Sequence, residues 1–134
     1  MALPEQDKER LRTRTVEVVL ALRAAYLAEH GGSVALEHWN HLQTRMKSAS
    51  KRASGPEDWA SDICRRLRIP SLSVSSSRCL VDLASAVRDI DAIDEWFALL
   101  AKETPYIIAL ARLSAEAAKD AKEAARAAKE EAAC

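Results

Sequence analysis

The sequence of 134 residues is poor in the residue types that build sheets, tight turns and disulfide frameworks. It contains 3 Gly, 4 Pro and 3 Cys, and only 4% of its residues are aromatic. Such a composition argues against a β-sandwich, a collagen-like chain and a turn-rich disulfide scaffold. No phosphate-binding loop of the form G-x-x-x-x-G-K-[ST], no G-x-G-x-x-G turn and no G-x-S-x-G elbow occurs. We therefore predict neither a cofactor nor catalytic residues, and expect a protein that is not an enzyme.

Long apolar runs are also missing. The longest near the N-terminus, Val18 to Leu22, has five residues, whereas a membrane span needs about 20. We expect a soluble, cytoplasmic protein with no membrane partner. Because Cys64, Cys79 and Cys134 are odd in number and far apart, they are interpreted as free thiols in a reducing compartment.

What the sequence does contain is helical periodicity, with apolar residues recurring at three- and four-residue steps. Five or six helices are predicted: Pro4 to His30, Ser33 to about Arg52, Pro56 to the residues before Pro70, Ser76 or Ser77 to about Ile90, a short helix from Asp91 or Asp94, and a last helix that starts at Thr104-Pro105. The Ser-rich stretches 48–56 and 70–77 are predicted to be connections. The predicted fold is an all-α, single-domain bundle over residues 1–113, followed by an Ala/Lys/Glu-rich helical extension over 114–134.

The residues that share the apolar face of each predicted helix form the predicted core. They are Leu22, Trp39, Met46, Trp59, Ile63, Leu67, Leu80, Leu83, Val87, Trp96, Leu99, Ile108 and Leu110.

Two histidines three residues apart raise the question of a metal site. His38 and His41 share one predicted helix with Glu37, and such spacing can place two ligands on one metal ion. Zinc needs a third or fourth ligand, however, and His30 is the only other histidine. We predict no metal site and expect His38 and His41 on the polar outer face of a helix whose inner face includes Trp39.

Arg23 and His30 match the loose R-x(4–6)-H spacing of the HEPN ribonucleases, which are also all-α. That resemblance implies a histidine general base beside an arginine that stabilises phosphate charge. Here Ala24 stands where a polar residue often follows the arginine, and His30 precedes Gly31, where a histidine has an ordinary helix-end role. A HEPN-like ribonuclease is the second alternative function.

The net charge of zero hides a partition along the chain. Between residues 43 and 68 lie seven basic and three acidic residues, and between 82 and 103 lie two basic and six acidic residues. The basic block comprises Arg45, Lys47, Lys51, Arg52, Arg65, Arg66 and Arg68. The acidic block comprises Asp82, Asp89, Asp91, Asp94, Glu95 and Glu103.

Clusters of Lys and Arg hold phosphate backbones mainly through charge. The basic block is therefore predicted to bind the backbone of RNA or single-stranded DNA. Only Trp59 is interleaved with it, so a platform for stacking bases is not expected. Opposite charges on one small protein also favour head-to-tail self-association.

In architecture and charge, though in no motif, the chain resembles the small subunit of class 1 CRISPR RNA-guided effector complexes. The resemblance implies a helical bundle without catalytic residues, several copies of which line the guide or target strand and contact other protein subunits of a ribonucleoprotein. The alternative is a small helical inhibitor or immunity protein that binds another protein through the acidic block.

Overall fold

A computed structural model describes residues 3–31, 35–70, 72 and 74–133. Within these residues the chain forms α-helices and no strand, so the predicted all-α class is confirmed. The helices are α1 (Glu5–His30), α2 (Ala35–Ser50), α3 (Pro56–Leu67), α4 (Val74–Ile90) and α5 (Ile93–Ala133). No helix in the described part of the chain is both long enough and apolar enough to cross a bilayer.

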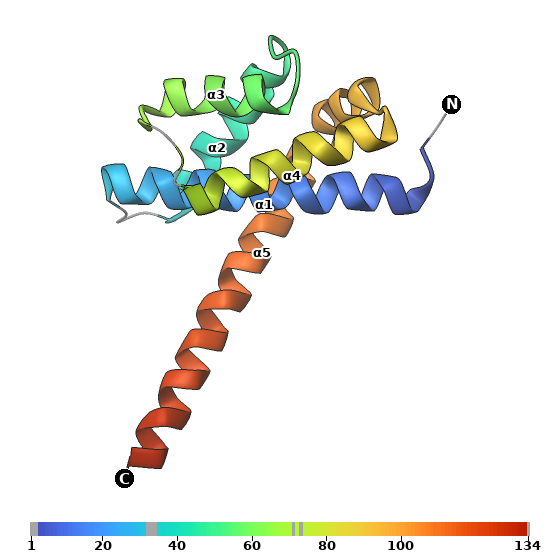
Figure 1. The fold of residues 1–134 in the computed structure, drawn as a ribbon. Coiled ribbons are helices and arrows are strands. Elements are labelled where there is room, and N and C mark those ends of the chain that lie inside the picture. The colour runs from blue at the N-terminus through green and yellow to red at the C-terminus, as the bar shows by residue number, and fades with distance from the viewer. Residues whose placement is uncertain (1–2, 32–34, 71, 73, 134) are drawn as a thin grey trace.

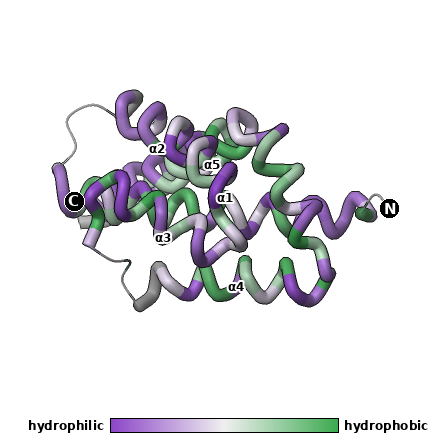
Figure 2. Tube along the Cα trace, turned by 90° about the horizontal axis from the view of Figure 1, so that it is seen from above, coloured by the Kyte–Doolittle hydropathy of each residue, from purple (hydrophilic) through white to green (hydrophobic). Residues whose placement is uncertain are grey.

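The long helix α1 is the centre of the bundle and contacts each of the other four helices. Figure 1 shows α4 running along α1, with α2 and α3 stacked on one side and the C-terminal end of α5 projecting from the other. Seen from above in Figure 2, the hydrophobic stretches lie along the middle of the bundle, and hydrophilic stretches lie near both chain ends. This is the arrangement expected of amphipathic helices that bury one face each.

Two fully buried tryptophans lie at the centre of the core. Trp59 and Trp96 pack edge to face, with ring centroids 5.5 Å apart. The Trp96 indole N–H donates to the Thr15 hydroxyl (3.1 Å), and that hydroxyl donates to the Leu11 carbonyl (2.7 Å). The Trp59 indole N–H donates to the Met46 carbonyl (3.3 Å). Both rings therefore bury their apolar surface without leaving a polar atom unpaired.

Most of the predicted core is buried, with two exceptions. Leu80 and Leu110 are only partly buried and pack against the core from its margin. Leu110 directly precedes Ala111, after which no residue of α5 up to Glu130 is buried, so Leu110 lies at the margin of the core. Cys64 and Cys79 are also partly buried, and burial raises the pKa of both thiols, which lowers their reactivity.

Helix α4 starts earlier than predicted. It begins at Val74, inside the segment predicted to be a linker, so the expected caps at Ser76 or Ser77 are wrong. Relative to alanine, each serine lowers the stability of a helix by at most about 0.7 kcal/mol. A serine run therefore does not by itself prevent helix formation. The predicted cap Ser33 and the terminal Cys134 lie outside the described residues.

The prediction of two helices after residue 91 is wrong, because α5 continues through Pro105. Proline has no N–H, so the Ala101 carbonyl loses its usual partner four residues on, and a proline inside a helix costs about 3 kcal/mol. Pro105 and Ala101 both lie on the exposed side of α5, where water reaches the backbone. On the opposite side Leu100, Thr104 and Ile107 are buried. Because buried residues both precede and follow Pro105 in the sequence, packing on the bundle keeps the segments before and after the proline in one helix.

The C-terminal part of α5 makes little contact with the bundle. Ala111 is the last buried residue in the part of α5 described up to Glu130, and every residue from Glu116 to Glu130 is exposed. This stretch falls within the predicted Ala/Lys/Glu-rich extension.

One ion pair joins α1 to α5 across the bundle. The Arg12 guanidinium donates to both carboxylate oxygens of Glu103, at 3.0 and 3.1 Å, and also to Glu9 (2.5 Å). The Arg12 side chain is only 11% exposed, and its partners Glu103 and Glu9 are 27% and 63% exposed. The hydrogen bonds that Arg12 donates to Glu103 raise the pKa of Arg12 further above its already high ordinary value.

Replacing the fully buried Leu83 with alanine is expected to lower the free energy of unfolding by about 2–5 kcal/mol, because a cavity opens in the core. Leu113→Ala removes the same atoms from an exposed site on α5 and is expected to change stability by less than about 0.5 kcal/mol. Urea denaturation followed by circular dichroism measures both. Equal losses in the two variants would contradict the burial described here.

Glu103→Gln is expected to lower the free energy of unfolding by about 1–3 kcal/mol, because it leaves the buried Arg12 guanidinium without its main charged partner. Glu9→Gln removes the more exposed partner of the same guanidinium and is expected to cost less. The same denaturation measurement ranks the two variants. A larger loss for Glu9→Gln would show that the pair between α1 and α5 is not the one that contributes most to stability.

Candidate nucleic-acid interface

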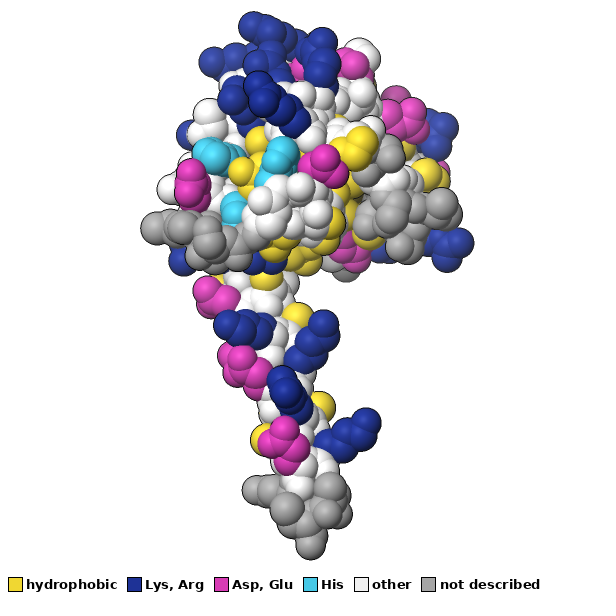
Figure 3. All heavy atoms as spheres, turned by 90° about the vertical axis from the view of Figure 1, so that its left-hand side faces the viewer, with side chains coloured by type: hydrophobic (Ala, Val, Ile, Leu, Met, Phe, Trp, Pro, Cys, Tyr) yellow, Lys and Arg dark blue, Asp and Glu magenta, His cyan; other side chains and the backbone are white. Residues whose placement is uncertain are grey.

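The structure places the basic block on the hairpin formed by α2 and α3, which pack against each other. Its residues come from α2, from the turn after it, from the last turn of α3 and from the cap that ends α3. Figure 3 shows Lys and Arg side chains gathered at the top of the bundle, over this hairpin, with the histidines just below them.

Five members of the block are exposed: Lys47, Lys51, Arg52, Arg65 and Arg68. The other two, Arg45 and Arg66, are partly buried. The adjacent Arg65 and Arg66 differ sharply, with side chains 76% and 23% exposed. The block therefore contains both exposed and partly buried cations.

Asp62 orients two of these arginines. Its Oδ1 accepts a hydrogen bond from Arg65 Nη2 (2.5 Å), and its Oδ2 accepts one from Arg66 Nε (3.0 Å). Burial opposes ionisation of this carboxyl, but the hydrogen bonds from the two guanidinium groups outweigh it, and the pKa of Asp62 is lowered. Sequence reasoning missed this contact, although spacings of three and four residues on one helix are a signal for it.

Below the block lies a hollow of about 220 Å³. Three helices and the cap after α3 line it with Tyr26, His30, His41, Arg45, Arg66, Leu67 and Arg68. We call it the His/Arg pocket. The sequence separates these residues by up to 42 positions, so no local motif indicated that they meet.

All three histidines of the chain surround the ring of Tyr26. The centroids of His30, His38 and His41 lie 4.7, 5.1 and 6.1 Å from the centroid of Tyr26. His30 Nε2 lies 2.8 Å from the Leu67 carbonyl oxygen. Because a carbonyl oxygen only accepts, His30 Nε2 carries a proton and donates it, which ties the end of α1 to the end of α3.

Tyr26 also holds His41. Its hydroxyl lies 3.3 Å from His41 Nδ1, and Glu37 Oε1 lies 3.9 Å from His41 Nε2. Both nitrogens of the His41 ring thus have a polar neighbour, and the Tyr26 hydroxyl is the closer of the two.

The prediction that His38 lies on a polar outer face is wrong. His38 is buried, and its Nδ1 has no hydrogen-bond partner. The face of α2 that packs on the bundle is wide enough to include His38 beside Trp39, whereas His41 is exposed as predicted. Across the described residues, no three His, Cys, Asp or Glu side chains are grouped to hold a metal ion.

Arg23 and His30, the pair that matches the HEPN spacing, have different surroundings. The Arg23 guanidinium lies over the ring of Trp39, 4.8 Å from its centroid. His30 lines the His/Arg pocket, and Arg23 does not. The HEPN-like alternative therefore stays a prediction.

The acidic block is partly neutralised within the chain. Glu103 pairs with Arg12, and Asp89 lies 3.4 Å from Arg10. Both arginines come from α1, which packs against α4 and α5. Counting charge along the sequence could not show this pairing, because the partners are about 80 to 90 residues apart.

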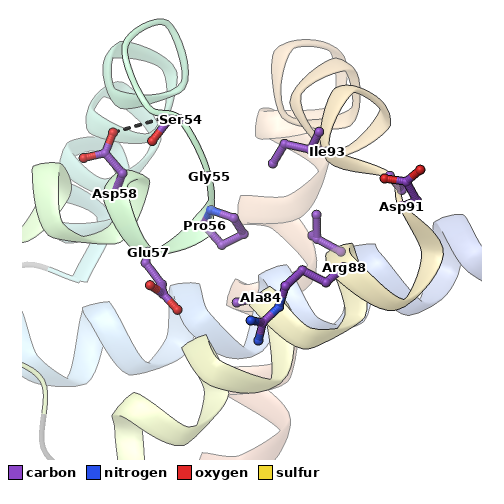
Figure 4. A pocket seen from close by; sticks show the side chains of 11 residues that line it. Ser54, Gly55, Pro56, Glu57, Asp58, Ala84, Arg88, Asp91 and Ile93 are labelled. Atoms are coloured by element: carbon purple, nitrogen blue, oxygen red, sulfur yellow. Dashed lines mark hydrogen bonds between the residues drawn. The ribbon is translucent and has the colours of Figure 1, made fainter.

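A larger hollow, of about 480 Å³, lies between the start of α3 and the junction of α4 and α5. Figure 4 shows Pro56 and Ile93 facing it from opposite sides, with Arg88 below them. Asp58 turns back to accept a hydrogen bond from the Ser54 N–H (3.0 Å). Three carboxylates and one guanidinium line this hollow, a charge balance that does not suit a polyanion.

Comparison with known proteins gives no match: no family model, no curated protein and no solved structure resembles the chain closely enough to be reported. Its function is therefore inferred from geometry and charge.

Asp62→Asn is expected to lower the melting temperature at pH 6, and the difference from the unaltered protein is expected to shrink as the pH falls toward 3. The pKa of Asp62 is lower in the folded protein than its ordinary value of 3.8, so the ionised carboxylate stabilises the fold above that pH. This stabilisation is lost as Asp62 becomes protonated in the folded state. Thermal melts across this pH range measure the gap, and a gap that widens on acidification would contradict the assignment.

Proposed function

We propose that the chain is a non-catalytic subunit of a ribonucleoprotein and binds the phosphate backbone of RNA or single-stranded DNA through the basic block. The proposal extends the resemblance to the small subunit of class 1 CRISPR effector complexes. One observation carries it: the seven cations of residues 45–68 gather on one helical hairpin, and five of them are exposed.

The acidic and basic residues at the two ends of α3 are separated along the helix. Glu57 and Asp58 lie in its first turn, and Arg65 and Arg66 lie in its last turn. At a rise of about 1.5 Å per residue, seven residues separate Asp58 from Arg65 by about 10 Å, which is roughly one Debye length at 0.1 M salt. The carboxylates of the first turn therefore reduce the positive potential around Lys51 and Arg52, their neighbours in sequence, more than they reduce the potential around Arg68.

The pairing of Asp89 and Glu103 with arginines of α1 supports the basic block over the acidic block as the binding surface. A carboxylate that already has a cation beside it contributes less negative potential to a partner. An inhibitor that bound through the acidic block would have to compete with these internal pairs.

Self-association in such an assembly would use the exposed end of α5. Figure 1 shows it projecting away from the side that carries α2 and α3. A strand bound at the basic block and a second copy bound at α5 would therefore not compete for one surface.

The triple variant Lys51→Gln, Arg52→Gln, Arg65→Gln is expected to weaken binding to single-stranded RNA similarly for all base sequences. Each lost phosphate contact lowers the slope of log K against log salt by about 0.7, so the slope is expected to fall by about 2. Fluorescence anisotropy between 50 and 200 mM salt measures the affinity and the slope together.

The matched control is Lys119→Gln, Lys122→Gln, Arg126→Gln, which removes three exposed cations from the end of α5. It is expected to leave affinity and salt slope unchanged. If the two triple variants behave alike, the basic block is an ordinary solvated surface and the proposed function is wrong.

A further inference from the structure

The His/Arg pocket differs in charge from two other hollows of the molecule. Its lining includes three guanidinium groups and two imidazoles and no carboxylate. The larger hollow in Figure 4 contains Glu57, Asp58 and Asp91 against Arg88. A third hollow, near the start of α1, sets Lys8 and Lys102 against Glu95 and Glu103. Of the three, the His/Arg pocket is the one suited to an anion.

Several side chains that line it are held in place before any ligand binds. His30 is fixed by its bond to the Leu67 carbonyl, His41 lies between Tyr26 and Glu37, and Arg66 is oriented by Asp62. The bond to Asp62 uses one of the five N–H donors that a guanidinium carries. Donors that are already positioned bind a charged ligand with less loss of side-chain entropy.

The size of the pocket limits what it can enclose. Its volume of about 220 Å³ is below the roughly 300–1,000 Å³ of sites that enclose a drug-sized ligand. A single anionic group fits this space, and the rest of its molecule would extend outside. The basic block begins at the rim of the pocket, because Arg45, Arg66 and Arg68 belong to both.

A phosphate monoester matches these donors better than the diester of a strand interior. At neutral pH a monoester carries roughly −1.5 to −2 charges and three terminal oxygens that accept hydrogen bonds. An internal diester carries one negative charge and two such oxygens. Guanidinium groups bind phosphate oxygens in pairs, so three arginines favour the group with more oxygens.

We infer that the His/Arg pocket binds a phosphate monoester, namely the terminal phosphate of a nucleic-acid strand or that of a free nucleotide. That the phosphate belongs to a nucleic-acid strand rests on the proposed function, whereas the binding of a phosphate group by the pocket does not. In an assembly, a pocket for the strand end would place one copy at a terminus, while the basic block would bind the interior of a strand.

The test compares three probes at pH 7.5 and 100 mM salt: a single-stranded RNA with a 5′-phosphate, the same RNA with a 5′-hydroxyl, and adenosine 5′-monophosphate. The phosphorylated RNA is expected to bind about tenfold more tightly than its hydroxyl twin, because charge-assisted hydrogen bonds to its terminal phosphate are added. Anisotropy measures the two RNAs, and calorimetry measures the mononucleotide.

Two double variants locate the effect. Arg45→Gln with Arg68→Gln removes two lining cations and is expected to abolish the preference for the phosphorylated RNA. Lys51→Gln with Arg65→Gln removes two cations of the basic block that do not line the pocket, and is expected to weaken both RNAs while the preference remains. Circular dichroism checks that both variants keep their helicity.

The outcomes separate this inference from the proposed function. If both RNAs bind equally well and Lys51→Gln with Arg65→Gln weakens them, the pocket is overturned and the proposed function stands. If only the mononucleotide binds, and Arg45→Gln with Arg68→Gln abolishes that binding, the pocket stands with a small phosphate as its ligand and the proposed function falls. A preference for phosphate that survives in Arg45→Gln with Arg68→Gln overturns the pocket.

Discussion

The contact between Trp59 and Trp96 determines where the candidate interface lies. Trp59 belongs to α3 and Trp96 to α5, and their hydrogen bonds reach α2 through Met46 and α1 through Thr15. Four of the five helices thus meet at one pair of buried rings. Since α3 is a short helix, this central anchor sets the position of its last turn, which carries Arg65 and Arg66. A substitution that disturbs the packing around the two rings would therefore displace Arg65 and Arg66 although neither arginine is replaced.

Helical periodicity is local, and for that reason the sequence predicts most of the fold. Trp59 and Ile63 of α3, like Leu83 and Val87 of α4, are four residues apart on one apolar face of their helix, and these faces are the ones that pack. Pro105 misled the prediction because the effect of a proline depends on the burial of the residues around it. The start of α4 was missed for a related reason, since serine permits a helix as well as a linker.

The candidate site could be predicted only in part. The residues of the basic block are consecutive enough in sequence to be noticed, but the His/Arg pocket depends on three helices meeting at one end of the bundle. His30 meets Leu67 across 37 residues, and Glu103 meets Arg12 across 91. A count of charges along the chain therefore does not show which charged side chains lie close together in the folded protein. The acidic block looks unpaired in the sequence because its partners Arg10 and Arg12 come from the first helix.

The exposed end of α5 gives the molecule a long reach for its size. At about 1.5 Å per residue, the stretch from residue 112 to 130 extends about 28 Å beyond the last buried turn. A compact domain of about 100 residues has a radius of gyration near 13 Å. Two copies that met through these ends could therefore keep their bundles apart by a full bundle width. In such a pair α5 would act as a spacer, and its length would set the interval between successive basic surfaces.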